Sequence, residues 1–163
     1  MALGDAGAFN GMADRYHNGD DLPQDQRKTL ELWERSGELG STEALHNIGH
    51  SYFHGNGVNK DMRKVRQCWE HAAIQGYPHS RHSLGDLEWD EGDHKRAMKH
   101  FIIAARSGFK LSLDVVQDGF RSGTVTKPEF DKALRAFQRS VNEAKSEQRD
   151  KYAEYQRRRG SDS

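Results

Sequence analysis

Residues 48–76, IGHSYFHGNGVNKDMRKVRQCWEHAAIQG, contain the pattern that decides the fold. Shifting the chain by 36 residues superposes this stretch on residues 12–40 with every internal spacing retained. The identical residues that then coincide include Tyr16 and Tyr52, Gly19 and Gly55, Asp25 and Asp61, Lys28 and Lys64, Trp33 and Trp69, and Gly40 and Gly76. Two copies of one supersecondary unit therefore occupy the first half of the chain.

The second half continues the pattern less strictly, with a shorter loop inside the unit. Leu84-Gly85 matches Ile48-Gly49, and a last copy is indicated by Val116, Phe120, Gly123, Ala133 and Phe137. We expect four repeats, at about residues 8–43, 44–79, 80–111 and 112–144, after a short tail at 1–7. Four units exceed the roughly three that a stacked core needs for stability.

Each repeat has the apolar spacing of two helices. Ile48, Gly49 and Tyr52 fall on one side of a first helix, and Val65 and Trp69 fall on one side of a second. The segment between them is rich in glycine and ends at Asp61, a residue type that caps helices. No strand pattern competes, so we predict an all-α solenoid. Its recurring aromatic residues are expected to form the core between repeats, since a ligand-stacking box rarely recurs at constant spacing.

The composition argues against two classes of partner, nucleic acids and membranes. The 163 residues carry 25 basic and 25 acidic side chains, and no apolar run approaches the roughly 18 residues of a membrane helix. We therefore expect a cytoplasmic protein that binds neither nucleic acid nor membrane. The single cysteine, Cys68, is expected to be reduced and structural, because it has no partner for an internal disulfide.

The second repeat resembles the Sel1-like repeat throughout: Ile48-Gly49, Tyr52, Gly55-Asn-Gly57-Val58, Asp61, Lys64, Trp69, Ala72-Ala73 and Gly76 follow that family's pattern. Repeat one is looser, and repeats three and four lack the Gly-x-Gly-Val loop. The resemblance implies an α/α superhelix similar to tetratricopeptide arrays, whose first helices line a concave groove. It also implies a scaffold or adaptor that binds proteins, without naming the partner.

The candidate groove follows from the side of each first helix that is opposite its core positions. The partner-binding residues expected there are Asp14, His17, Glu43, His46, His50, Phe53, His54, His82, Asp86, Trp89 and Arg121. Phe53 and Trp89 would be aromatic anchors if they are exposed. The alternative is that both pack against neighbouring helices.

Three histidines, His46, His50 and His54, form an i, i+4, i+8 stripe on this face. Such spacing could bring two imidazoles to one metal ion, with a third ligand from the next repeat. The chain lacks a zincin pattern and a cysteine pair, so we expect no metal and no cofactor. The leading interpretation is a polar stripe that faces a partner, and the alternative function is a histidine-dependent response to metal or pH.

No catalytic motif emerges, and we predict that the protein is not an enzyme. Gly55-Asn-Gly57 follows a helix and lacks the third glycine of a dinucleotide-binding loop. Residues 90–93 are acidic but lack the spaced ligands of a calcium loop.

Helical spacing in the C-terminal part of the chain predicts one long helix over residues 126–157, about 48 Å in length. Its apolar seam ends before the helix does, so residues 145–159 form an extension that either caps the solenoid or contacts another chain. We expect a monomer, with self-association through this helix as a possibility. Residues 160–163 are expected to be a disordered tail.

Overall fold

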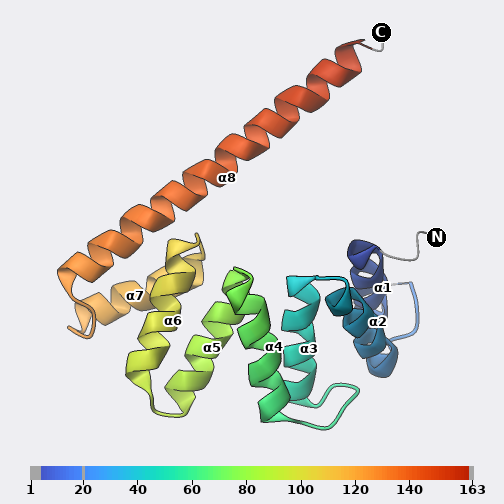
Figure 1. The fold of residues 1–163 in the computed structure, drawn as a ribbon, viewed down its shortest axis with the longest axis horizontal. Helices are drawn as coiled ribbons and strands as arrows, with labels where there is room; N and C mark the ends of the chain where they lie inside the picture. The colour runs from blue at the N-terminus through green and yellow to red at the C-terminus, as the bar shows by residue number, and fades with distance from the viewer. Residues whose placement is uncertain (1–4, 20, 162–163) are drawn as a thin grey trace.

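The computed structural model describes residues 5–19 and 21–161 and shows a right-to-left succession of helical hairpins (Figure 1). Within these residues eight α-helices and no strands are present. Their bounds are α1 Ala6–Asn18, α2 Gln26–Glu38, α3 Thr42–His54, α4 Met62–Ile74, α5 Pro78–Asp90, α6 His94–Arg106, α7 Lys110–Arg121 and α8 Lys127–Ser161. The predicted all-α solenoid of helix-turn-helix repeats is confirmed.

Local sequence signals explain where the helices begin and end. Asp25 and Asp61 each cap a second helix, and the Asp61 carboxylate accepts from the backbone amides of Arg63 and Lys64 at 3.1 Å. Gly55 ends α3 with a φ of 79°, a left-handed conformation that favours glycine. The loop between α5 and α6 is reduced to residues 91–93, as the third repeat predicts.

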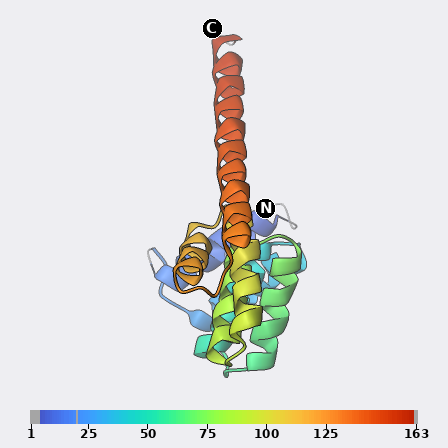
Figure 2. The same ribbon diagram turned by 90° about the vertical axis from the view of Figure 1, so that its left-hand side faces the viewer.

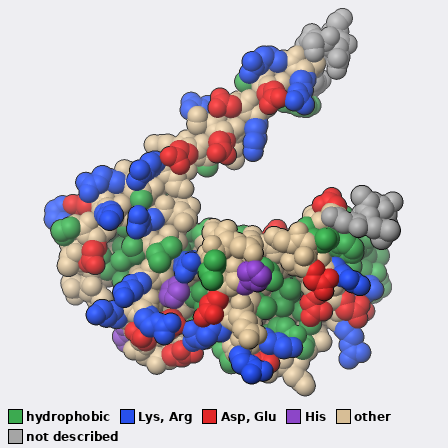
Figure 3. Space-filling model, viewed as in Figure 1, with side chains coloured by type: hydrophobic (Ala, Val, Ile, Leu, Met, Phe, Trp, Pro, Cys, Tyr) green, Lys and Arg blue, Asp and Glu red, His purple; other side chains and the backbone are tan. Residues whose placement is uncertain are grey.

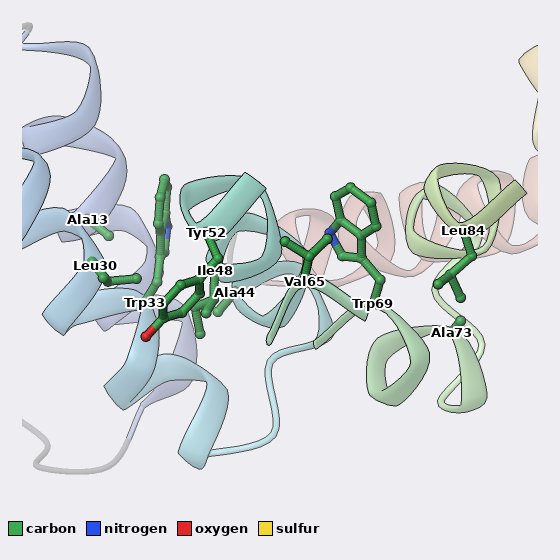
Figure 4. Close-up of a cluster of buried hydrophobic side chains, with 10 residues drawn as sticks. All are labelled: Ala13, Leu30, Trp33, Ala44, Ile48, Tyr52, Val65, Trp69, Ala73 and Leu84. Atoms are coloured by element: carbon green, nitrogen blue, oxygen red, sulfur yellow. The ribbon is translucent and has the colours of Figure 1, made fainter. Parts of the chain in front are cut away.

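Two apolar clusters form the core. In the first, buried residues continue from Ala13 in α1 through Trp33 and Trp69 to Leu84 in α5, so one cluster joins three consecutive repeats (Figure 4). The second surrounds Phe101 and includes side chains of α7 and α8. Each hairpin thus buries its apolar side against the next hairpin, which is how a solenoid is stabilised.

Gly49 and Gly85 allow the two helices of a repeat to cross closely. A Cβ atom at Gly49 would lie 2.2 Å from Nε1 of Trp69, and one at Gly85 would lie 2.6 Å from Cε1 of Phe101. These glycines are therefore needed for packing, as their place in the repeat predicts.

The last helix extends far beyond the solenoid. At 35 residues α8 is about 52 Å long, and Figure 2 shows it rising away from the other helices. Phe130, Leu134 and Phe137 pack on the second core cluster. From residue 142 to residue 158 every side chain is exposed except the half-buried Ser146.

The two predicted tails differ from the structure. Residues 160 and 161 belong to α8, since the helix continues through its charged extension, and residues 162–163 lie outside the described part of the chain. At the other end α1 begins at Ala6, after its cap Asp5, so residues 6 and 7 of the expected tail are helical, while residues 1–4 lie outside the described part of the chain. None of the described helices is both long and apolar enough to cross a membrane.

Candidate interaction site

The eleven predicted partner-binding residues all lie on first helices of repeats, α1, α3, α5 and α7, whose shared surface we call the first-helix face. They differ in how much of each side chain is buried. Five are half-buried rings, His17, His46, His50, Phe53 and His82. Five are exposed, Glu43, His54, Asp86, Trp89 and Arg121, while Asp14 is half-buried.

The half-buried rings pack on the large aromatic residue of the second helix in their own repeat. Around Trp69, the ring centres of His46, His50 and Phe53 lie at 6.1, 5.3 and 5.9 Å. The Trp69 indole N–H also donates to the backbone carbonyl of His46 at 3.1 Å. Phe53 therefore packs against a neighbouring helix and is not the exposed anchor that the first interpretation describes.

Repeats one and three show the same arrangement. The ring centres of His17 and Trp33 lie 5.2 Å apart, and those of His82 and Phe101 lie 5.1 Å apart. We call these ring contacts, together with those around Trp69, the aromatic layer. For the four histidines this packing role was not predicted from the sequence, because only their second-helix partners recur as identical or similar residues.

Two histidines of the aromatic layer also join successive repeats. Nδ1 of His46 lies 3.0 Å from the hydroxyl oxygen of Ser80, and Nδ1 of His82 lies 2.8 Å from that of Ser112. Both serines are fully buried on the first helix of the next repeat. The sequence contains a signal for these bonds. His46 precedes Ser80 by 34 residues and His82 precedes Ser112 by 30, in each case two residues less than the length of the repeat that contains the histidine.

Burial is the main influence on the pKa values of two histidines in the stripe, His46 and His50. Burial, followed by repulsion from His50 and His79, lowers the pKa of His46 to about 3. Burial also lowers the pKa of His50, with a smaller contribution from His54. A neutral imidazole at His46 is consistent with its bond to Ser80 and with the ring of His50 only 4.6 Å away.

The structure does not assemble a metal centre from this stripe. No three histidine, cysteine, aspartate or glutamate residues in the described part of the chain are placed so that they could hold one ion. His79, a predicted third ligand, instead packs its ring against Tyr77 and Phe109, at 5.0 and 4.6 Å.

Of the two predicted aromatic anchors, Phe53 and Trp89, only Trp89 is exposed. It follows Phe53 by 36 residues, the length of the second repeat. Its ring stacks on His94 at the start of α6, with ring centres 4.2 Å apart, and 44% of the residue remains accessible. One side of the indole is thus held by the protein while the rest is open to solvent.

Two carboxylates lie within one helical turn of Trp89 on α5. Asp86 and Asp90 lie one turn apart on α5, and burial raises the pKa of Asp86, with a further rise from Asp90. Nε2 of His82 lies 3.6 Å from Asp86. Helix α3 contains no Lys or Arg at all, and Arg121 on α7 is paired with Asp118 at 3.0 Å.

Sequence reasoning also missed a buried ionic network between α4, α5 and α6. Glu88 is only 2% exposed, and its carboxylate receives Arg66 at 2.7 Å and Arg96 at 3.3 Å. Arg66 also binds Glu91. These residues do not recur between repeats, so the overlay that revealed the packing positions could not reveal them.

Comparison with known proteins agrees with this geometry. The Sel1 repeat family matches the chain at residues 8–41, 42–77 and 82–109. These segments lie over the first three predicted repeats, whereas α7 and the start of α8 fall outside them, so the fourth repeat stays a prediction. A search of curated protein sequences finds no significant match.

Solved structures show the same fold. A Sel1 repeat protein from Oxalobacter formigenes superposes with a TM-score of 0.71 at 20% identity, over 86% of this chain and 59% of that one. A protective antigen of uropathogenic Escherichia coli with an SLR fold superposes with a TM-score of 0.69 at 23% identity, over 86% of this chain and 31% of that one. The chain thus spans less than two thirds of the length of either protein. With three repeats matched over more than half of its residues, the chain belongs to the Sel1 repeat family.

Proposed function

We propose that this chain is an adaptor that binds a protein or peptide on its first-helix face, around Trp89. Sel1 repeat proteins generally act as scaffolds for protein–protein interaction and are typically not enzymes. The observation that carries the proposal is the partly exposed indole of Trp89, fixed by its stack on His94. Tryptophan is among the residues most enriched at the energetic centre of protein interfaces.

The surroundings of Trp89 supply polar contacts for a partner. Asp86 and Asp90 on the same helix would accept hydrogen bonds from partner amides, lysines or arginines. His54 is also exposed, at the end of α3 in the preceding repeat. A ring held on one side needs little further ordering when a partner covers it, which lowers the entropic cost of binding.

Trp89→Ala is expected to abolish capture of the partner while the protein stays folded. The wild type, Trp89→Ala and Ile74→Ala would each be used as bait, and bound proteins would be compared by quantitative mass spectrometry. Loss of one hot-spot tryptophan costs about 2 kcal/mol or more, so partner recovery at limiting concentration should fall at least about tenfold.

Ile74 is the matched control, because it is an apolar residue 79% exposed on a second helix, α4. Ile74→Ala should retain the partner. Thermal unfolding of each variant reports whether the fold is intact. Equal recovery by wild type and Trp89→Ala would refute binding at this site.

A further inference from the structure

Lysine and arginine are concentrated on the second helices and on the start of α8. Helix α6 contains four of these residues, Lys95, Arg96, Lys99 and Arg106, and no aspartate or glutamate. Helix α4 contains three, with one glutamate. Figure 3 shows blue prevailing over α6 and the adjoining turns of α8, although the whole chain has no net charge.

An exposed stripe runs along α6. Lys95, Lys99, Ile103 and Arg106 are spaced by four, four and three residues, which places them on one side of a helix. All four are exposed, and Ile103 keeps 43% of its surface accessible. This stripe therefore presents an aliphatic side chain between cationic ones.

The stripe ends in a groove between α6 and α8. The groove has a volume of about 490 Å³ and is lined by Ile103, Arg106, Ser107, Ala136, Arg139, Ser140 and Glu143. Arg106 and Arg139 are both exposed, and among the described residues neither guanidinium group forms an ion pair. One carboxylate, Glu143, also lines the groove. Two guanidinium groups thus stand free beside an apolar surface formed by Ile103 and Ala136.

We infer that this α6–α8 groove binds an acidic protein segment that inserts an aliphatic side chain against Ile103 and places carboxylates on Arg106 and Arg139. Paired arginines recognise carboxylates with defined geometry, and a complementary charge also accelerates association. The proposal goes beyond binding at Trp89, since it adds a second surface of opposite charge and makes the chain able to hold two partners.

The apolar residues of this face favour a protein over a nucleic acid. Single-stranded nucleic acids bind where aromatic side chains provide stacking platforms between basic residues. The apolar residues that line the α6–α8 groove are instead aliphatic, Ile103 and Ala136. Aliphatic side chains beside arginines suit an amphipathic acidic segment.

The test uses the full chain and an amphipathic helical peptide of about 15 residues, with leucines along one face and glutamates on either side of them. Binding would be measured by fluorescence anisotropy, and the site would be mapped by amide chemical shifts. We expect saturable binding that weakens with salt and shifts the amides of Ile103, Arg106 and Arg139. The double variant R106E/R139E should weaken binding about tenfold or more.

The matched control is R27E/R35E, which reverses two exposed charges on α2 at the other end of the solenoid. It should bind the peptide as the wild type does. Failure of the peptide to bind, or equal binding by R106E/R139E and the wild type, would overturn the inference. So would tighter binding of a single-stranded oligonucleotide of the same charge, or a salt-sensitive dimer that R106E/R139E dissociates, because either result assigns the groove to another partner.

Discussion

Gly49→Ala is expected to destabilise the chain by about 3 kcal/mol, although alanine is the better helix former. The added Cβ would lie 2.2 Å from Nε1 and 2.5 Å from Cδ1 of Trp69, far inside van der Waals contact. Trp69 is 3% exposed and its indole N–H is bonded to the carbonyl of His46, so it has little room to move. Chemical denaturation would measure the loss.

Gly11→Ala is the matched control for this prediction. Gly11 also lies inside a helix, α1, but an added Cβ there would meet nothing within 4 Å. This variant should gain up to about 1 kcal/mol from helix propensity alone. The two substitutions should thus change stability in opposite directions, and a Gly49→Ala protein as stable as the wild type would contradict the close crossing of α3 and α4.

Acid is expected to weaken the fold through His46. Its pKa is about 3 in the folded chain and about 6.5 in an unfolded one, so the unfolded state binds more protons between these values. Stability should therefore be constant above pH 6.5 with respect to this group, and should fall as the pH drops from 6.5 toward 3. Between pH 7 and pH 5 the loss should be about 1 to 2 kcal/mol.

His46→Asn isolates this contribution, because asparagine can bond Ser80 but does not titrate in this range. The variant should lose stability less steeply than the wild type between pH 7 and pH 5 in denaturation experiments. If stability fell equally steeply with pH in the wild type and in His46→Asn, protonation of the His46 imidazole would not be what weakens the fold in acid.

The fold was predictable because its determinants recur. Gly49 and Gly85, or Trp33 and Trp69, occupy the same repeat position, and an overlay of the chain on itself detects identical residues. The length of α8 was also predictable, since helical spacing continues through its charged residues. Its course away from the solenoid was not, because that depends on how few apolar residues follow Val141.

The candidate site was predictable only in part. A helical wheel places His46, Phe53 and Trp89 opposite the core of their own helix, but it does not include the next repeat or the second-helix aromatics. In the structure the first two are covered, by Ser80 and by Trp69, and Trp89 is not. Exposure on a solenoid face thus depends on neighbouring helices, both of the same repeat and of the next one, which spacing within one helix cannot supply.

The central claim is that recurring residues hold the solenoid while the partner binds the exposed, non-recurring residues around Trp89. Hydrogen–deuterium exchange of the chain, alone and with the partner captured in a Trp89-dependent manner, tests it most directly. Binding of the partner around Trp89 should slow the exchange of α5 amides over residues 82–90 and of the adjoining α3 amides. Unchanged exchange in α5, with protection confined to α2 or to the free end of α8, would contradict it.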